Sequence, residues 1–350
     1  MIRTGIGLVR SIERLFSRSL PIDSGGGSRY YFTCLTDKQK EIYNAMLSGI
    51  RTYSKEIRIP LKPIDEVSKI FNYMLLDNPM IFYVSSSFRL SSGLHGTFIP
   101  DYKYARHLAE EYTVAIKKYL SVFDGLKYKS DLDKEIFVHD YCLNNFSYDY
   151  AFKDNSFSVL GPVINKTAVC EGIAKFVKLA FDCLGVQSLV VSGKAKNPVQ
   201  NSAMEGHAWN IVKIGGKAYH LDVTFDMTIK GKRNRYDYFN LSDEDIKKDH
   251  VIADKVPACT TVGGDYFSMN SLVIHNPAEL EKFIGSCLIH GKKNIMLKLK
   301  NVKNAEIIVD KVISIAQRQY IDICKRSVMV EVVYNESQMV FEIGFNTHKS

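Results

Sequence analysis

Gly215-Gly216 constrains the fold of this chain more than any other feature, because it separates two strand-like segments, residues 207–214 and 217–224. Two adjacent glycines accept the positive φ angles that a tight two-residue hairpin loop requires. We therefore predict an antiparallel hairpin in which Ile214 faces Lys217. This pairing fixes the register of every residue further from the turn.

The predicted register brings two polar residues together. Trp209 faces Asp222, and His207, two positions before Trp209, points to the same face of the sheet. His207 and Asp222 are then diagonal neighbours whose Cα atoms lie roughly 7–8 Å apart, within hydrogen-bonding reach of their side chains. A slip of one residue would place them on opposite faces, so this prediction depends on the turn.

Cys170 is the first residue of a predicted helix that ends at Leu184, before Gly185 at the position that favours a left-handed cap. A helix N-terminus and a neighbouring imidazolium together lower the pKa of a thiol from about 8.5 to roughly 3.5–7.5. Cys170, His207 and Asp222 therefore have the residue types of an activated nucleophile, its general base and an orienting carboxylate.

Each of the three residues also has a structural interpretation. Cys170 alone would be a small buried residue, His207 a packing residue beside Trp209, and Asp222 the cap of a turn. A zinc site of Cys170, His207 and Asp222 is a chemical alternative, but the spacing differs from that of compact zinc modules. The presence of all three, with the diagonal register of His207 and Asp222, favours the nucleophile, and we predict no metal and no cofactor.

Other candidates are weaker. Cys183 is predicted on the core side of its helix, and His220, which faces Ile211, is predicted on the other side of the hairpin. A basic loop follows the candidate site, and its residues are Lys230, Lys232, Arg233 and Arg235. We interpret this loop as a solvated turn rather than as a surface that steers an acidic substrate.

Composition narrows the class of protein. Hydrophobic residues make up 46% and charged residues 24% of the 350 residues, which is typical of a soluble globular protein with two or three domains. The net charge of +8 is modest and the basic residues are scattered, which argues against nucleic-acid binding. Seven cysteines without a C-x-x-C pair favour a reducing compartment, so we predict a cytoplasmic protein, with export as the alternative.

Residues 1–28 are predicted to form an N-terminal arm, with apolar residues at helical spacing up to residue 20 and a Gly/Ser linker at 24–28. We favour a loosely attached amphipathic helix over contact with a membrane surface or a transit peptide. No apolar run approaches the roughly 20 residues of a transmembrane helix. Arg10, Glu13 and Arg14 interrupt the apolar stretch that a secretory signal needs.

Three further regions are predicted. Residues 29–127 are mainly helical, and residues 128–262 contain the nucleophile helix and the hairpin. Residues 268–350 alternate strand, helix, strand, helix, strand, strand, which predicts a small α/β sandwich of ferredoxin-like type. We expect this last module to have a structural or docking role.

Four motifs resemble the transglutaminase-like superfamily, whose fold is papain-like. They are His139-Asp140-Tyr141 with Tyr148-Asp149, Ala168-Val169-Cys170-Glu171-Gly172, Gly206-His207-Ala208-Trp209-Asn210, and Asp222-Val223-Thr224-Phe225-Asp226. This similarity extends over residues 131–250 and implies an α+β fold in which the nucleophile helix packs on an antiparallel sheet. The flanking layout also resembles bacterial members of the superfamily.

The resemblance implies Cys170 as nucleophile, His207 as general base and acid, and Asp222 as its orienting partner. It also marks Trp209, Glu171 and Asp226 as supporting residues close to the substrate. The implied reaction is acyl transfer or hydrolysis of an amide through a thioester, with the Cys170 N–H as one oxyanion donor. The animal enzymes use a tryptophan well before the cysteine, whereas the single tryptophan of this chain, Trp209, follows it.

We expect the substrate to be a peptide or protein, with a cell-wall peptide as one candidate. Protease, amidase, deamidase and cross-linking activities stay open, because all share the thioester step. The alternative hypothesis is a non-catalytic protein- or peptide-binding module that retains the fold, since about two thirds of the chain lies outside the matching region.

Overall fold

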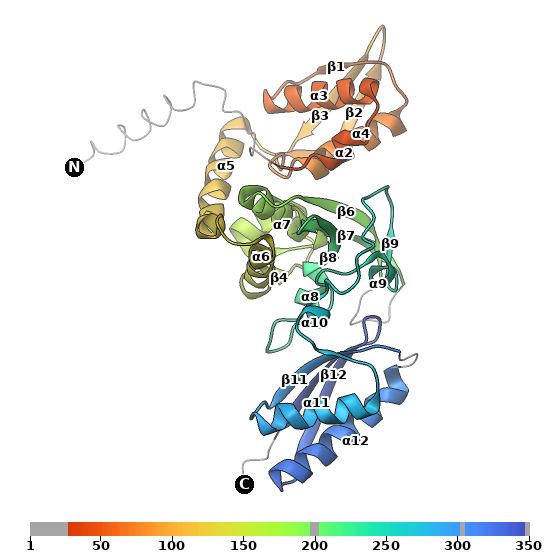
Figure 1. Cartoon of the computed structure of the whole chain (residues 1–350). Helices are drawn as coiled ribbons and strands as arrows, with labels where there is room; N and C mark the ends of the chain where they lie inside the picture. Colours follow the sequence, from red (N-terminus) through yellow and green to blue (C-terminus); the bar gives the residue numbers. More distant parts are fainter. Residues whose placement is uncertain (1–26, 197–202, 302–304, 347–350) are drawn as a thin grey trace, which may run out of the picture.

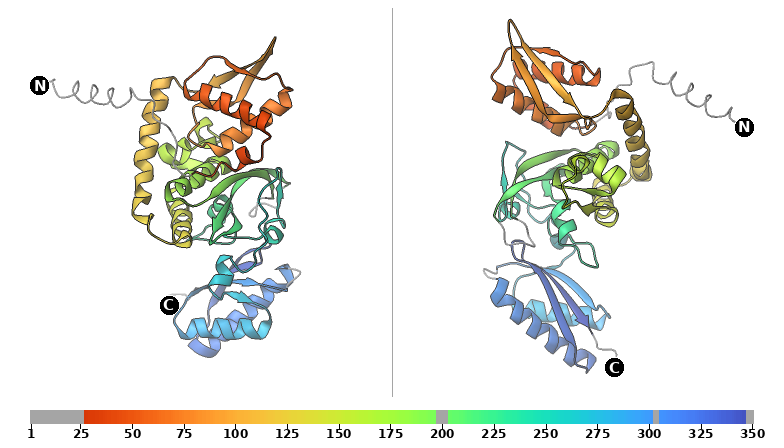
Figure 2. Two further views of the ribbon diagram at one scale, coloured as in Figure 1. Left: turned by 45° about the horizontal axis from the view of Figure 1, so that its top comes forward. Right: turned by 180° about the vertical axis from the view of Figure 1, so that it is seen from behind.

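The computed structural model describes residues 27–196, 203–301 and 305–346. These residues form three parts that follow one another along a long axis, with the Cys170 helix in the middle part (Figures 1 and 2). The amphipathic segment predicted at residues 1–20 lies outside the described residues. Within the described ranges, no helix is both long and apolar enough to cross a membrane.

The N-terminal part combines helices with a small sheet. Its elements are α2 (Tyr30–Thr33), α3 (Asp37–Arg51), β1 (Ile57–Ile59), α4 (Ile64–Asp77), β2 (Val84–Ser92) and β3 (Gly96–Tyr102), and the strand order is β1-β3-β2. Thr36 begins α3 with a capping box, since its side chain and that of Gln39 each accept from the other residue's N–H. The sheet was not predicted, because five serines among the nine residues of β2 conceal its apolar alternation.

One hydrophobic core joins the N-terminal part to the middle part, so the boundary predicted near residue 127 does not separate two cores. The Tyr31 hydroxyl donates to the carbonyl of Val190 in the middle sheet, at 2.7 Å. Asp77 accepts from the N–H groups of Tyr31 and Phe32 and so fixes the start of α2. The N-terminal part is thereby anchored to the sheet beneath the candidate site.

Three helical elements lead into the middle part, namely α5 (Arg106–Leu120), η1 (Ser121–Leu126) and α6 (Asp131–Asn145). Ser130 begins α6 by accepting from the N–H of Asp133. Aromatic rings then pack these helices against the nucleophile helix, with Phe123 and Phe146 at 6.2 and 4.9 Å from Phe176 between ring centroids.

The middle sheet is antiparallel with the order β8-β7-β6-β9. Its strands are β6 (Ser188–Ala195), β7 (Glu205–Ile214), β8 (Lys217–Leu221) and β9 (His250–Ile252). Helix α7 (Cys170–Leu184) packs against β6 and β7, and Phe176, Val177 and Ala180 on it are fully buried. The helix ends at Gly185, whose φ of 72° gives the left-handed cap predicted there.

Short elements surround the start of α7. They are β4 (Ser147–Tyr148), η2 (Asp154–Phe157), η3 (Gly161–Asn165), β5 (Thr167–Ala168), α8 (Val223–Thr228) and α9 (Asp243–Ile246). β4 and β5 pair in parallel, with Tyr148 opposite Ala168. Tyr148 is therefore held close to Cys170, two residues after Ala168.

The C-terminal part has its own hydrophobic core. It contains α10 (Tyr266–Met269), β10 (Val273–Ile274), α11 (Pro277–Ile289), β11 (Asn294–Leu299), α12 (Ala305–Cys324), β12 (Met329–Asn335) and β13 (Val340–Asn346), and the sheet order is β10-β11-β13-β12. We predicted a ferredoxin-like arrangement, and this is wrong, because the second helix, α12, precedes the third strand, β12.

Arg235 fixes the C-terminal part to the middle part. Its guanidinium is 1% exposed, donates to both carboxylate oxygens of Asp237 at 2.9 and 2.8 Å, and lies 3.4 Å from Glu342 of β13. Arg235 was predicted in a solvated turn, but it is a buried docking residue. The whole architecture is α+β with the nucleophile helix on an antiparallel sheet, as predicted.

Candidate active site

Cys170, His207 and Asp222 meet at the N-terminal end of α7. The Nε2 atom of His207 lies 2.7 Å from Oδ2 of Asp222, and the Cys170 thiol is a hydrogen-bond partner of the same imidazole. Because Nε2 faces the carboxylate, Nδ1 is the nitrogen left for the thiol. A thiol, an imidazole and a carboxylate in this order have the arrangement of an activated nucleophile.

The hairpin register explains this geometry. β7 and β8 pair from Asn210 opposite Leu221 to Ile214 opposite Lys217, which is the predicted register. β8 stops at Leu221 because Asp222 begins α8, where its Oδ1 accepts from the N–H of Phe225 at 3.0 Å. Asp222 is therefore both a helix cap and the partner of His207, with a different oxygen for each role.

Cys170 is positioned by the segment before it. As the first residue of α7, it carries one of the N–H groups that have no partner within a helix. The N–H of Val169 donates to the carbonyl of Ser156 at 3.1 Å, and Gly172 allows this loop to approach closely. The thiol is partly exposed, whereas the Asp222 side chain is fully buried.

Charge stabilises the His207–Asp222 pair. Burial lowers the pKa of His207, but the charge and hydrogen bond of Asp222 outweigh burial and, with a contribution from Cys170, raise the pKa to about 10. Burial acts to raise the pKa of Asp222, but His207 and then His250 hold it well below its usual range. The pair is therefore an imidazolium and a carboxylate at neutral pH.

Tyr148 borders the thiol. Burial is the main cause that raises the pKa of its hydroxyl, and the nearby charges of Cys170 and Glu205 add to it. The Tyr148 ring makes an edge contact with Tyr150 at 4.9 Å between centroids, and Tyr150 is 70% exposed. An aromatic wall thus extends from the thiol to the solvent.

Asp149 braces the loop that carries this wall. Its carboxylate accepts from the N–H groups of Ala151 and Lys153, both at 3.0 Å, and from the Ser156 hydroxyl. Ser156 in turn accepts from Val169 through its carbonyl. The loop is therefore fixed relative to the first turn of α7.

A second histidine, which the sequence analysis missed, binds Asp222. Nε2 of His250 lies 3.1 Å from Oδ2 of Asp222, and its Nδ1 lies 2.6 Å from Oδ1 of Asp249. His250 belongs to the three-residue strand β9, where it pairs with Ala195 of β6. No local pattern predicts so short an edge strand.

Trp209, Glu171 and Asp226 occupy three different environments. Trp209 is 1% exposed and stacks behind His207 at 6.0 Å between ring centroids, so it supports the imidazole from within the core. Asp226 is also fully buried, and its carboxylate binds His139. Glu171 is partly exposed on the first turn of α7 and forms an ion pair with Lys175.

His139, from the first of the four motifs, is part of the scaffold. Its ring is fully buried between Asp140 and Asp226, at 3.0 and 3.1 Å. Burial lowers the pKa of His139, but the two carboxylates outweigh burial and raise it to about 9. The N–H of Tyr238 also donates to Asp226, so this cluster fixes α6 and α8 to the segment that follows.

Two other predictions are wrong. Facing residues in an antiparallel ladder share a face, so His220, opposite Ile211, lies on the same face as His207. It accepts from the Trp209 indole at 3.0 Å and binds Asp243 through Nε2. Cys183 is exposed and not on the core side of α7.

Two clusters in the described chain bring metal-binding atoms together: His207 with Asp222 and His250, and His220 with Asp243 and Cys259. In the second cluster the Trp209 N–H donates to Nδ1 of His220, so the neutral ring carries its proton on Nε2, facing Asp243. That tautomer has no lone pair for a metal. In the first cluster, separations of 2.7 and 3.1 Å are those of hydrogen bonds.

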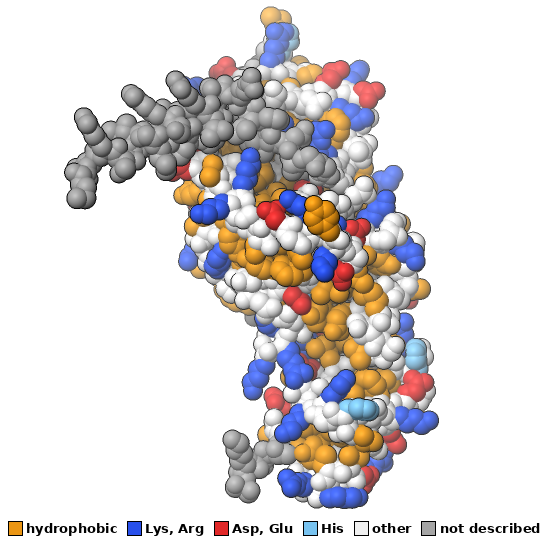
Figure 3. Space-filling view, turned by 60° about the vertical axis from the view of Figure 1, so that its left-hand side comes forward, with side chains coloured by type: hydrophobic (Ala, Val, Ile, Leu, Met, Phe, Trp, Pro, Cys, Tyr) orange, Lys and Arg blue, Asp and Glu red, His pale blue; other side chains and the backbone are white. Residues whose placement is uncertain are grey.

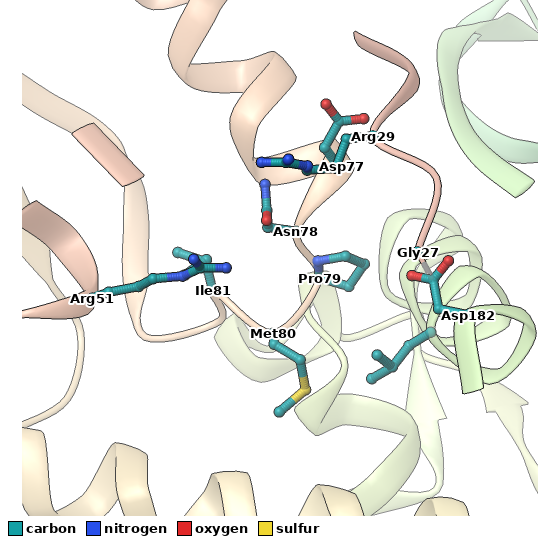
Figure 4. A pocket seen from close by; sticks show the side chains of 10 residues that line it. Gly27, Arg29, Arg51, Asp77, Asn78, Pro79, Met80, Ile81 and Asp182 are labelled. Carbon is teal, nitrogen blue, oxygen red and sulfur yellow. The ribbon is translucent and has the colours of Figure 1, made fainter. Parts of the chain in front are cut away.

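Other surface features lie away from the three residues. A cavity of about 40 Å³ between the N-terminal part and α7 is lined by Arg29, Arg51 and Asp77 among others (Figure 4). Its carboxylates already have partners, since Asp77 caps α2 and Asp182 binds Lys178. On the face seen in Figure 3, Lys and Arg side chains are spread along the molecule and form no single stripe.

Residues 122–223 match the family model of the transglutaminase-like superfamily, so this stretch is a transglutaminase-like domain and the predicted resemblance is confirmed for it. The matched stretch contains Cys170, His207 and Asp222 and ends before Asp226 and His250. A search of curated proteins gives no match.

Two solved structures are similar to this chain. One is described as "a Putative Cysteine Protease from Cytophaga hutchinsonii", with 13% identity, a TM-score of 0.26, and coverage of 39% of this chain and 61% of that chain. The other is described as a TGase, with 17% identity, a TM-score of 0.29, and coverage of 63% of this chain and 58% of that chain. The chain thus spans less than two thirds of the length of either structure.

Proposed function

We propose that this chain is a thiol-dependent hydrolase or acyltransferase acting on peptide or protein amides. The observation that carries this proposal is the position of His207 between the Cys170 thiol and the Asp222 carboxylate. Tyr148 and the exposed Tyr150 beside the thiol favour a peptide that lies across the aromatic wall.

The first half of the reaction forms a thioester. The Cys170 thiolate attacks the amide carbonyl carbon, which forms a C–S bond and a tetrahedral oxyanion. The C–N bond then breaks, and the leaving amine takes the proton from His207, which Asp222 holds in place. We assign the N–H of Cys170 and the hydroxyl of Tyr148 as the two donors for the oxyanion.

The second half resolves the thioester. Water or an amine attacks the carbonyl carbon, gives its proton to His207 and releases the thiolate. Water produces a carboxylic acid, and an amine produces a new amide. Hydrolysis and cross-linking therefore use the same three residues and differ only in the nucleophile that reaches the thioester.

Alkylation rates test the nucleophile without knowledge of the substrate. We expect iodoacetamide at pH 6 to modify Cys170 at least about tenfold faster than the more exposed Cys34 and Cys183, because only Cys170 lies beside an imidazolium. His207→Ala should remove this difference, and the control Cys183→Ser should retain it. Equal rates at Cys170 and the exposed thiols would contradict the proposal.

A peptide library with a thiol-reactive group tests the aromatic wall. Tyr150→Ala should weaken labelling of Cys170 by peptides about tenfold, whereas Tyr150→Phe should retain it, because the ring supplies the contact area. Equal losses in both variants would exclude ring contact as the cause. Peptide capture that survives Cys170→Ala, with no turnover by the wild type, would favour the binding-module hypothesis instead.

A further inference from the structure

One carboxylate oxygen of Asp222 accepts hydrogen bonds from two histidines. Oδ2 lies 2.7 Å from Nε2 of His207 and 3.1 Å from Nε2 of His250, while Oδ1 binds the N–H of Phe225. The side chains of His250 and Asp222 have no exposed surface. The carboxylate is thus fixed by three donors, one of which comes from β9, 28 residues further along the chain.

The other nitrogen of His250 also faces a carboxylate. Nδ1 lies 2.6 Å from Oδ1 of Asp249, and Oδ2 of Asp249 accepts the buried Tyr238 hydroxyl at 2.7 Å. An ionised carboxylate only accepts hydrogen bonds, and a neutral imidazole offers one N–H. Two ionised carboxylates on one ring therefore require a proton on both nitrogens.

We propose that His250 is a positioning residue for the triad, held between Asp249 and Asp222 so that it orients the Asp222 carboxylate toward His207 and takes up part of its charge. This inference rests on the proposed function, because it concerns the same site. His207 must give its proton to the leaving amine, and an Asp222 whose charge acted on His207 alone would hold that proton more tightly. The hydrogen bond from His250 to the same oxygen of Asp222 reduces this hold without touching the substrate.

The surroundings of His250 support a structural bridge. The titratable groups that face it from the neighbouring elements are Asp222, Asp249, His207, His220 and Tyr238. Trp209 and Phe225 pack on the ring, each at 4.9 Å between centroids. The ring is therefore confined between two carboxylates by aromatic neighbours, in a position with no exposed surface.

Nitrogen NMR tests the bridge directly. Long-range proton–nitrogen spectra of the full chain, labelled at histidine, report which ring nitrogens carry protons. We expect the ring of His250 to carry two N–H protons at pH 7 in the wild type and one in Asp249→Asn. A wild-type His250 with a single N–H would overturn the proposal. Binding of one zinc ion per chain that moves the nitrogen signals of both His207 and His250 would also overturn it.

The pH profile of Cys170 alkylation tests the positioning role. We expect His250→Phe to lower the rate constant at pH 6–7 about 10- to 100-fold and to change the shape of the profile, because a misplaced Asp222 no longer orients His207. His250→Gln retains a donor for Asp222 and should recover part of the rate. Unchanged profiles in both variants, with circular dichroism showing folded protein, would overturn the proposal.

The two proposals fail in different ways. If wild-type Cys170 reacts no faster than Cys34 and Cys183, the proposed function fails, and the NMR experiment still decides whether His250 bridges the carboxylates. If wild-type Cys170 is fast and the His250 variants match it, only the role of His250 fails.

Discussion

Gly172→Ala tests how closely the loop at Ser156 braces the nucleophile helix. A Cβ at Gly172 would lie 2.2 Å from the carbonyl oxygen of Ser156 and 3.0 Å from that of Ser158. Both are backbone atoms, which cannot rotate away as the end of a side chain can. The loop or the first turn of α7 must therefore move.

Two opposing terms set the magnitude. Alanine favours a helix over glycine by up to about 1 kcal/mol. Overpacking costs about 1–3 kcal/mol, and displacement of the loop also weakens the hydrogen bond from Val169 to Ser156, worth about 1 kcal/mol. We expect the free energy of unfolding to fall by about 1–3 kcal/mol, and the alkylation rate of Cys170, two residues away, to fall with it.

Gly285→Ala is the matched control. The same substitution in α11 meets the side-chain oxygen of Gln319 at 2.8 Å, at the flexible end of that side chain. We expect this variant to be unchanged or more stable by up to about 1 kcal/mol. Urea unfolding followed by circular dichroism reports on both variants, and the fluorescence of Trp209, the single tryptophan, reports on the middle part. A Gly172→Ala variant that has the same free energy of unfolding and the same Cys170 alkylation rate as the wild type would refute the reasoning.

Three further predictions concern charge. Burial raises the pKa of Glu135 to about 8, so its contribution to stability is full below its usual pKa near 4.5 and is lost as pH rises through 8. The wild type should therefore lose roughly 2–4 kcal/mol of unfolding free energy between pH 5 and pH 9, and Glu135→Gln should not show this loss. The same pH dependence of urea unfolding in both proteins would contradict this. The pKa of His207 is also raised, to about 10, so its stabilising contribution is full below about pH 6.5 and is lost as pH rises through 10. The rate of amide turnover should fall as pH approaches 10, because His207 loses the proton that it gives to the leaving amine. A rate that stays constant above pH 10 would exclude His207 as the acid. Arg235→Met leaves Asp237 and Glu342 without their ion-pair partner, so we expect the free energy of unfolding to fall by about 3–5 kcal/mol and residues 253–265 to become sensitive to proteolysis. Glu342→Gln keeps the pair of Arg235 with Asp237 and should lower the free energy of unfolding by less than about 1 kcal/mol.

The residues whose geometry is set locally were predictable. Gly215-Gly216 determines the turn, the turn determines the register, and the register brings His207 to Asp222. Cys170 at the start of α7 follows from helical periodicity and the Gly185 cap. Each step uses contacts between residues near one another in the chain or in one hairpin, where period and turn chemistry leave few alternatives.

Features set by packing between distant segments were not predictable. Arg235 reads as part of a basic surface loop, and only the approach of β13 with Glu342 makes it a buried ion-pair residue. β2 lies in a region predicted to be mainly helical, and pairing with β3 makes this serine-rich segment a strand. The charge or polarity of a residue favours a position in water, but a partner from a distant segment can bury the same residue.

His250 shows where sequence reasoning ends within the site itself. The sequence contains nine histidines, and His250 follows Asp249 in a polar stretch that resembles a surface turn. Its position is decided by three residues of edge pairing between β9 and β6, which place its ring 5.5 Å from that of His207, with both rings at the same oxygen of Asp222. A hairpin rule can bring a base and a carboxylate together, but the charge that acts on this carboxylate depends on a strand outside the hairpin. The motif therefore predicts the three residues of the candidate site, whereas the second histidine on Asp222 comes from β9.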